Sequence, residues 1–251
     1  MNLDDSIQEA ATQLTRYSKT LDAESSQYWI NHGERFCYIT QLFGEILEEL
    51  QASSSTLERV LDIGNSYQTM MINEVWPQLQ IDTMGFFAER YAPNGPTRHY
   101  DYDLNDTYFP EKWLAIEEPE KYDIIFFLEV IEHLYTSPKS VLDFLRSILK
   151  PGGHLVIQTP NAASLIKRLR LLFGENPYEL IRNDRMNPGH FREYTKQEIT
   201  ELANKSGFVV KDLRMTDYFV ENTFAEKVCG RVAKILPQTF KTAMTVVLKV
   251  R

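Results

Sequence analysis

From residue 56 onward, short apolar runs alternate with segments of helical periodicity, and this alternation constrains the fold more than any other feature. Strands that alternate with helices form βαβ units, which build a parallel sheet covered by helices on both faces. The run Ile124–Leu128 contains no polar residue, as is typical of a strand buried on both faces. We therefore expect an α/β fold with a doubly wound, mostly parallel, seven-stranded sheet. Its strands are predicted at residues 59–63, 80–86, 98–104, 122–130, 154–159, 208–215 and 243–250.

Helical periodicity marks most of the remaining chain. Residues 1–50 have the pattern of two helices, and the polar stretch Gln51–Thr56 separates them from the alternating region. We expect an N-terminal helical cap at 1–55 and a main domain at 56–251, with a substrate loop or lid at 162–194. Further helices are predicted at residues 67–75, 138–149, 164–173, 195–206 and 222–236.

Composition and charge exclude several classes of protein. Lys and Arg number 27 against 35 Asp and Glu, a net charge of −8, which disfavours a dedicated nucleic-acid binder. The longest apolar run is too short to cross a bilayer, and the N-terminus is acidic where a signal peptide would be basic. Cys37 and Cys229 lack the spacing of a disulfide framework or a thiolate zinc site. These features predict a cytoplasmic protein that is not integral to a membrane.

Polar and glycine residues follow the predicted strands, where a doubly wound sheet binds its ligands. The first strand runs into Asp62-Ile63-Gly64, and glycine there lets the backbone approach a nucleotide-like ligand, although a plain turn would use the same residues. Three more motifs follow in order along the chain. They are Asp103-Leu104-Asn105, Glu129-Val130-Ile131-Glu132-His133-Leu134 and Leu149-Lys150-Pro151-Gly152-Gly153.

This ordered set resembles the class I S-adenosylmethionine-dependent methyltransferases over about residues 58–215, especially the branch with the ubiquinone-pathway O-methyltransferases. The resemblance implies a Rossmann-like methyltransferase domain with S-adenosylmethionine as cofactor. It places Asp62 and Gly64 beside the methionine part and Asp103 near the adenine amine, although Asp103 could instead form an Asx turn. The implied cofactor-binding residues are Asp62, Ile63, Gly64, Asn65, Ser66, Asp103, Leu104 and Glu129.

Two departures from the family pattern are visible. Ser66 and Gln68 stand where the family usually has its second and third glycines. The segment Gly85-Phe86-Phe87 offers no acid for the ribose hydroxyls, so Glu89 or Asp82 would have to substitute. These departures motivate an alternative interpretation, a degenerate methyltransferase fold that binds a partner without catalysis.

A carboxylate and imidazole cluster is the second candidate site. Glu129, Glu132 and His133 project on one side if the chain enters a helical turn after the fourth strand, and such oxygen and imidazole ligands suit magnesium or manganese. With the later His190, the pattern is similar to that of small-RNA 3′-end 2′-O-methyltransferases, which implies four metal ligands: Glu129, Glu132, His133 and His190. His133 or His190 could instead act as a general base without metal, or these residues could only cap a helix and pack under a loop.

The segment 164–173 combines an apolar stripe with Lys167, Arg168 and Arg170. This is typical either of a lid helix or of a helix in peripheral contact with an anionic membrane. The main hypothesis is an O-methyltransferase acting on a hydroxyl of a small molecule, glycan or lipid precursor, with divalent metal assistance. RNA 2′-O-methylation shares the metal pattern but conflicts with the acidic charge of the chain.

Overall fold

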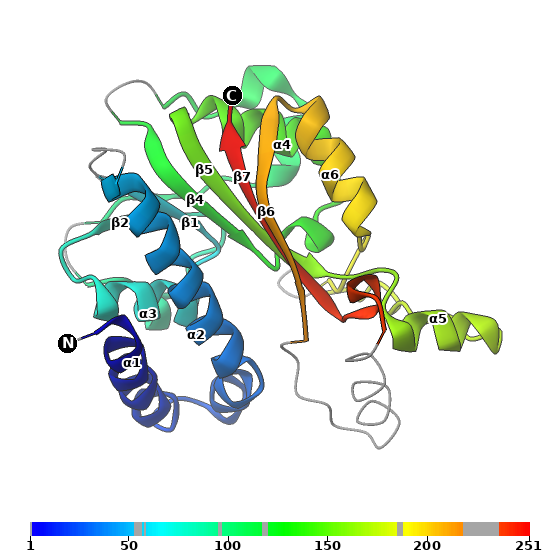
Figure 1. Cartoon of the computed structure of the whole chain (residues 1–251), viewed down its shortest axis with the longest axis horizontal. Coiled ribbons are helices and arrows are strands. Elements are labelled where there is room, and N and C mark those ends of the chain that lie inside the picture. Colours follow the sequence, from blue (N-terminus) through cyan, green and yellow to red (C-terminus); the bar gives the residue numbers. More distant parts are fainter. Residues whose placement is uncertain are drawn as a thin grey trace. The chain divides into compact units, whose positions relative to one another are not determined.

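The computed structural model describes residues 2–52, 57, 59–94, 97–116, 120–184, 188–217 and 236–251 (Figure 1). Its seven strands form a sheet in the order β3-β2-β1-β4-β5-β7-β6, flanked by helices. β1 is parallel to β2, β2 to β3, and β4 to β5, whereas β7 is antiparallel to both β5 and β6. The predicted doubly wound, mostly parallel α/β fold is therefore confirmed.

Contacts divide the chain into two compact units, whose described residues fall within 2–101 and 102–251. The first unit contains α1 (Leu3–Ser18), α2 (Ala23–Ala52), β1 (Arg59–Ile63), α3 (Tyr67–Val75), β2 (Gln80–Met84), the short 3-10 helix η1 (Glu89–Tyr91) and β3 (His99–Tyr100). The second contains η2 (Leu104–Tyr108), η3 (Pro110–Lys112), β4 (Tyr122–Leu128), η4 (Ile131–His133), α4 (Pro138–Ser147), β5 (Leu149–Pro160), α5 (Leu165–Leu172), α6 (Lys196–Lys205), β6 (Phe208–Thr216), η5 (Gln238–Phe240) and β7 (Ala243–Val250).

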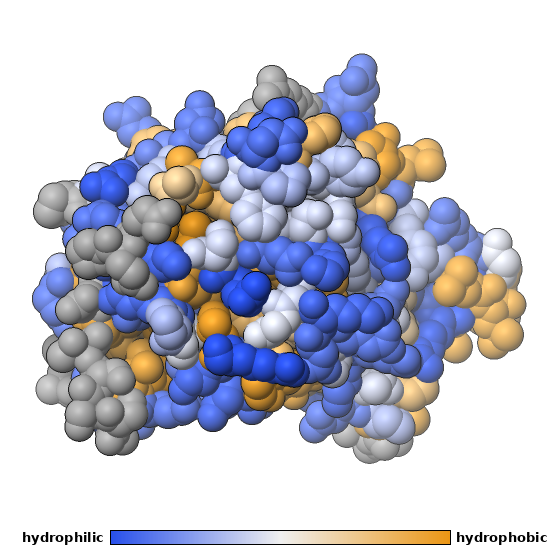
Figure 2. All heavy atoms as spheres, turned by 90° about the horizontal axis from the view of Figure 1, so that it is seen from above, coloured by the Kyte–Doolittle hydropathy of each residue, from blue (hydrophilic) through white to orange (hydrophobic). Residues whose placement is uncertain are grey.

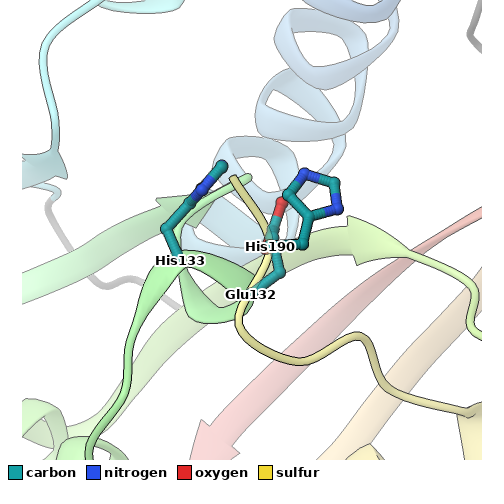
Figure 3. A group of neighbouring side chains, drawn as sticks. All are labelled: Glu132, His133 and His190. Atoms are coloured by element: carbon teal, nitrogen blue, oxygen red, sulfur yellow. The ribbon is translucent and has the colours of Figure 1, made fainter. Parts of the chain in front are cut away.

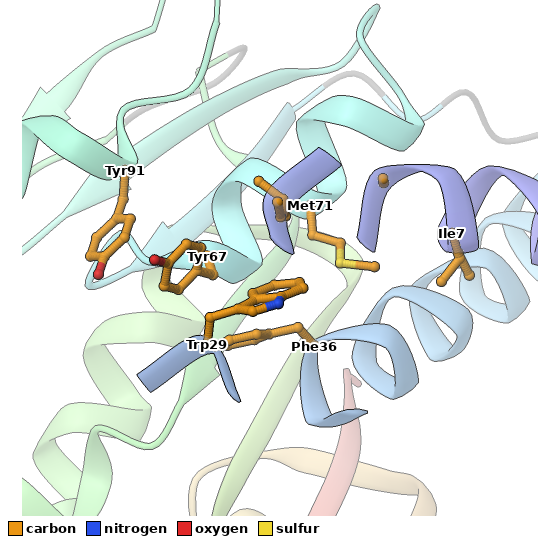
Figure 4. Packing of buried hydrophobic residues seen from close by; sticks show 8 residues of the cluster. Ile7, Trp29, Phe36, Tyr67, Met71 and Tyr91 are labelled. Atoms are coloured by element: carbon orange, nitrogen blue, oxygen red, sulfur yellow. The ribbon is translucent and has the colours of Figure 1, made fainter. Parts of the chain in front are cut away.

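The first two helices share their core with α3 (Figure 4). Trp29 and Phe36 of α2 stack with ring centroids 5.8 Å apart, and Tyr67 of α3 meets Trp29 edge to face at 5.2 Å. Ile7 of α1 and Met71 of α3 lie in the same buried cluster. This shared burial explains why α1 and α2 belong to the same compact unit as β1, β2 and β3.

The core of the second unit is built on β4. Its residues Ile124, Ile125, Phe126 and Phe127 are fully buried, as their unbroken apolar run predicts. Leu128 is only half-buried, so the prediction of five buried residues holds for four. β4 pairs in parallel with β5, whose 12 residues begin at Leu149 rather than at the predicted residue 154.

Two other strands are shorter than predicted, and one predicted helix cannot be compared. β2 ends at Met84 because Gly85 takes a φ of 98°, outside the strand region. β3 covers only two residues rather than 98–104, because Asp103 begins a 3-10 helix instead of ending a strand. The helix predicted at 222–236 lies outside the described residues, apart from residue 236. Among the described residues, no helix is both long and apolar enough to cross a membrane.

Candidate functional site

The turn after β1 has the backbone geometry expected of a ligand-binding loop. Gly64 has a φ of 75°, and its N–H donates to the carbonyl of Met84 at the end of β2, 2.8 Å away. A Cβ built on Gly85, the next residue after β2, would lie 3.9 Å from the Gly64 nitrogen. An added Cβ at Gly85 would thus meet no close atom, but a side chain at either glycine would face a strained positive-φ conformation.

The residues that follow Gly64 use their side chains to hold the loop. Ser66 is the N-cap of α3 and forms a capping box with Thr69. The Asn65 side chain donates to the Ala88 carbonyl at 2.7 Å and accepts from the Ala88 N–H at 2.8 Å. Ser66 thus stands where the family usually has a glycine, and it begins α3. Because the side chains of Asn65 and Ser66 hold the loop, mainly the backbone of the loop is left to contact a ligand.

The side chains of Asp62 and Ile63 are buried rather than exposed at the surface of the loop. The Asp62 carboxylate is buried and accepts a 2.5 Å hydrogen bond from Thr69 Oγ1. Burial raises the pKa of Asp62 to about 7, while the Thr69 hydrogen bond opposes this shift. The Ile63 side chain is buried in β1, so only its backbone could meet a cofactor.

Two acids are candidates for the ribose hydroxyls, and the structure separates them. Asp82 is fully buried, pairs with Arg59 at 2.5 Å and accepts from the Arg98 N–H at 2.9 Å. Glu89 begins η1 and is exposed. Because Asp82 neutralises a buried guanidinium within the sheet, Glu89 is the better candidate of the two.

In the second unit, Asp103 caps η2. Its Oδ1 accepts from both the backbone N–H and the side-chain amide of Asn105, each at 2.9 Å. This is the Asx-turn arrangement that forms the alternative to an adenine contact. Leu104 is buried, whereas Asp103 is exposed. Asn105 in turn accepts from the Tyr135 N–H, which ties η2 to the segment after η4.

Glu129 connects β4 to η4 with an unusual backbone conformation. Its φ of 54° is the only positive value among the non-glycine residues that the structure describes. This left-handed conformation costs a non-glycine residue about 1–2 kcal/mol. Strained backbone of this kind concentrates at functional sites, where neighbouring contacts maintain it. The Glu129 N–H contributes by donating to the Gln158 carbonyl of β5 at 2.8 Å.

Among the described residues, Glu132, His133 and His190 form a group whose potential ligand atoms all lie within 4.8 Å of one another (Figure 3). Glu132 and His133 come from η4, and His190 comes from the loop that crosses over it. The predicted approach of the late loop to the end of β4 is therefore present in the structure. Glu129 lies outside this group, so three of the four predicted metal ligands come together.

Each histidine of the group has an acceptor at its Nδ1 atom. His133 Nδ1 lies 2.9 Å from the Gly189 carbonyl, and His190 Nδ1 lies 3.0 Å from Glu193 Oε1. A carbonyl cannot donate, so His133 Nδ1 must carry the proton, and the same holds for His190 beside a carboxylate. When such a ring is neutral, its Nε2 holds the lone pair. Burial is the main cause that lowers the pKa of His190 to about 4, so the His190 ring is neutral at pH 7.

Backbone contacts hold His190 in this position. The Arg192 N–H donates to the Glu132 carbonyl at 3.2 Å, and the Ala162 N–H donates to the Tyr194 carbonyl at 3.0 Å. A parallel bridge pairs Asn161 with Tyr194. The segment that carries His190 is therefore fixed to η4 on one side and to the end of β5 on the other. The Glu132 carboxylate is buried and accepts from Thr159 Oγ1 at 2.9 Å.

Two charged residues of this region are not singled out by the sequence patterns as parts of the site. Glu193 contacts His190 with one carboxylate oxygen and the ammonium group of Lys167 with the other. The sequence predicts Lys167 away from the apolar stripe of a lid or membrane-contacting helix, but the Lys167 side chain lies mostly buried, and burial lowers its pKa to about 8. The nearby charges of Glu132 and Glu129 oppose that shift. The three-residue spacing of His190 and Glu193 is a signal that could have indicated their contact.

Comparison with known proteins identifies the family. A model described as a methyltransferase domain matches residues 31–213. The chain belongs to this methyltransferase family. Among curated relatives, a probable S-adenosylmethionine-dependent methyltransferase of Mycolicibacterium smegmatis is 34% identical over 90 residues, which are 36% of this chain and 30% of that protein.

Two further relatives are ubiquinone biosynthesis O-methyltransferases. The mitochondrial enzyme of Dictyostelium discoideum is 35% identical over 71 residues, which cover 28% of this chain and 22% of that protein. The Aeromonas salmonicida enzyme is 24% identical over 104 residues, covering 41% of this chain and 42% of that protein. The chain thus spans less than half the length of the curated relatives that it matches.

Solved structures support the fold of this chain. A crystal structure of a methyltransferase from Clostridium acetobutylicum has a TM-score of 0.51 at 13% identity, covering 82% of this chain and 89% of that one. One from Listeria monocytogenes has a TM-score of 0.50 at 11% identity, covering 82% and 97%. At such low identity the similarity supports the shared architecture alone.

Proposed function

We propose that this methyltransferase transfers the methyl group of S-adenosylmethionine to a hydroxyl group of a small-molecule, glycan or lipid-precursor acceptor, with the help of a divalent cation. The family match supports methyl transfer, and the names of two curated relatives support an oxygen acceptor. The observation that carries the metal-assisted form is the tautomer of the two histidines. Both rings hold their Nδ1 proton toward an acceptor, so that two Nε2 lone pairs accompany a buried carboxylate.

The loop after β1 fits the cofactor by its backbone. Gly64 has the positive φ of a turn that brings backbone close to a ligand, and Ser66 starts α3 immediately afterwards. We assign Asp62, Ile63, Gly64, Asn65 and Ser66 to the cofactor in the first unit. Asp103, Leu104 and Glu129 belong to the second unit, and their contribution to cofactor binding stays a prediction from the family pattern.

The group of Glu132, His133 and His190 fits magnesium or manganese by its donor types, one carboxylate and two imidazoles. A divalent ion bound there would lower the pKa of a coordinated acceptor hydroxyl and hold its oxygen in position. Glu132 contributes the negative charge, and Thr159 orients its carboxylate. Glu129 follows β4 in a strained conformation and lies outside this group, and its part as a fourth ligand stays a prediction from the family pattern.

A metal-free alternative uses one imidazole as a general base. His133 or His190 would then take the hydroxyl proton on Nε2 while the acceptor oxygen forms its bond to the methyl carbon and the carbon–sulfur bond breaks. The paired tautomers favour the cation, because a single base needs only one ring. Donation from Nδ1 to a carbonyl or carboxylate is also the usual arrangement around a metal-bound histidine.

Metal dependence can be tested directly. In a chelator, methyl transfer from S-adenosylmethionine to a catechol-type test acceptor should fall, and it should return when manganese or magnesium is added. The His190→Ala variant should lose this rescue and bind manganese at least about tenfold more weakly, because the remaining protein ligands cannot complete the shell of the ion. Full activity in the chelator would leave the imidazole base as the mechanism.

The non-catalytic alternative and the RNA alternative have separate tests. Calorimetry with S-adenosylmethionine should detect binding to the wild-type chain, and no binding at millimolar concentration would favour a degenerate partner protein. RNA 2′-O-methylation needs a salt-dependent affinity for RNA, which the net charge of −8 disfavours. Small-molecule acceptors are therefore the first class to screen.

The outer end of α5 supports a second proposal, a peripheral contact with an anionic membrane by a protein that acts in the cytoplasm. Leu172 and Phe173 are 76% and 77% exposed, and Figure 2 shows hydrophobic residues gathered at the right-hand end, where α5 lies in Figure 1. Arg168 and Arg170 are exposed on the same short helix. Apolar side chains beside cations are the pattern of helices that lie on anionic lipid surfaces.

A further inference from the structure

Glu193 bridges two groups that come from distant parts of the chain. One carboxylate oxygen lies 3.0 Å from Nδ1 of His190, and the other contacts the ammonium group of Lys167, which α5 supplies. The Glu193 side chain is only 7% exposed. Lys167 Nζ also donates to the Asn161 carbonyl at the end of β5, at 3.4 Å. The result is a continuous chain of contacts from β5 and α5 through Glu193 to His190.

The charges of these groups explain why Lys167 and His190 both contact the buried carboxylate of Glu193. A buried carboxylate is costly unless a cation and hydrogen bonds compensate it. Lys167 provides the cation, and the Nδ1–H of His190 provides a hydrogen bond on the other oxygen. The Glu193 carboxylate can therefore accept a hydrogen bond from the imidazole. An acceptor at Nδ1 selects the tautomer whose lone pair is on Nε2.

The two histidines of the site differ in what fixes them. His133 donates to the backbone carbonyl of Gly189, which no side-chain substitution removes. His190 depends on a side chain, and its acceptor is charged. A charged acceptor also makes the ring a stronger electron-pair donor at Nε2. A side-chain substitution can therefore remove the acceptor that orients His190, but not the acceptor that orients His133.

We propose that Glu193 is a positioning residue that sets the tautomer and orientation of His190, and that Lys167 holds the Glu193 carboxylate in place for this purpose. The effect on metal binding rests on the proposed function, whereas the effect on the tautomer does not require any ion. The two parts can therefore fail separately.

The tautomer is measured by NMR of metal-free protein with ¹⁵N-labelled histidine. The chain has 5 histidines, and the His190→Asn variant identifies the His190 signals by their loss. In the wild type the His190 shifts should be those of a ring protonated at Nδ1. Glu193→Leu should move them toward the other tautomer or a mixture, whereas Glu193→Gln, which keeps an acceptor oxygen, should retain more of the wild-type pattern. Unchanged shifts in Glu193→Leu would overturn the positioning role.

Metal binding is measured by calorimetry with manganese alone. Glu193→Leu should weaken binding about 10- to 100-fold, the usual effect of losing such an outer partner, and Lys167→Met should weaken it less. A matched control is Asp143→Asn, which removes an acid paired with Lys139 on the surface of α4 and should leave manganese affinity unchanged. Equal losses in the control and in Glu193→Leu would contradict a specific role.

Two outcomes separate this proposal from the proposed function. If the wild type binds no manganese but Glu193→Leu changes the His190 tautomer, the metal mechanism fails and Glu193 remains a positioning residue for an imidazole base. If the wild type binds manganese and Glu193→Leu changes neither affinity nor tautomer, Glu193 is only structural. Should Glu193→Leu fold poorly by circular dichroism, Glu193→Met, which keeps the length of the side chain and removes the acceptor, carries the same comparison, and wild-type shifts and affinity in it would reject the role.

Discussion

The carboxyl group of Asp62 is buried in β1 and hydrogen-bonded to Thr69, two features that its place in a sequence motif does not reveal. A motif predicts which residue type stands at a strand end, but the packing of the following helix decides how far its side chain is from water. The same holds for Asp103, whose carboxylate accepts from Asn105 as an Asx turn. Single residues of the cofactor loop therefore have measurable structural roles in addition to the proposed binding roles.

Asp62→Asn should flatten the pH dependence of stability. Burial raises the pKa of Asp62 from 3.8 to about 7, so the folded protein keeps a proton that the unfolded chain releases between these values. The stabilisation is complete below about pH 4 and is lost as the pH rises through about 7, with a slope of about 1.4 kcal/mol for each pH unit in this window. Urea unfolding between pH 4 and 8 measures this slope, and a slope in Asp62→Asn equal to that of the wild type would contradict the assignment.

Gly64→Val should weaken S-adenosylmethionine binding at least about tenfold. The substitution places a β-branched side chain at a φ of 75° and blocks backbone approach to the proposed ligand. Gly174→Val is the matched control, since Gly174 has a φ of 79° with no atom within 4 Å of an added Cβ. Calorimetry on both folded variants distinguishes a cofactor effect from general backbone strain, and equal affinities would mean that the cofactor binds elsewhere.

At the scale of secondary-structure elements, the apolar run of β4 determines which side chains form the core of the second unit. Phe126 should contribute strongly to stability because it is fully buried in the middle of the strand. Phe126→Ala should lower the free energy of unfolding by about 3–5 kcal/mol, through lost burial and the cavity it leaves. Leu128→Ala should cost clearly less, because Leu128 is half-buried at the end of the strand. Urea denaturation compares the two, and a smaller loss in Phe126→Ala would contradict the assignment of the core.

The elements with strong periodicity could be predicted from the sequence, and those set by distant contacts could not. The bounds of β1, α3 and β7 agree with the prediction because apolar spacing and capping residues are local signals. β3 is shorter than predicted because the cap formed by Asp103 competes with extension of the strand. The approach of His190 to Glu132 follows from a family resemblance, whereas the Lys167–Glu193 contact joins residues 26 positions apart and leaves no local pattern.

At the scale of the whole molecule, charge and exposed apolar surface lead to different expectations. The net charge of −8 disfavours anionic partners in general, whereas α5 combines basic residues with an exposed apolar end. Wild-type protein should therefore sediment with phosphatidylglycerol vesicles and not with phosphatidylcholine vesicles. The double substitution of Leu172 and Phe173 by Asp should abolish this binding.

Val209→Asp provides the control for that experiment, because Val209 is an exposed apolar residue of β6, far along the chain from α5. It should leave vesicle binding unchanged. Loss of binding in both variants would indicate a non-specific effect of added negative charge. If the wild-type protein binds neither kind of vesicle but forms dimers, the exposed end of α5 serves self-association instead.

The attachment of the His190 segment has a consequence for how this protein can change during evolution. Residues 189–194 are fixed to η4 and to the end of β5, and the Arg182 N–H donates to the Pro188 carbonyl at 2.8 Å. Insertions and deletions between Arg182 and Pro188 would therefore change the length of the chain between them without displacing His190. Descendants of one ancestor could acquire acceptors of different size by such changes while inheriting the same reacting groups.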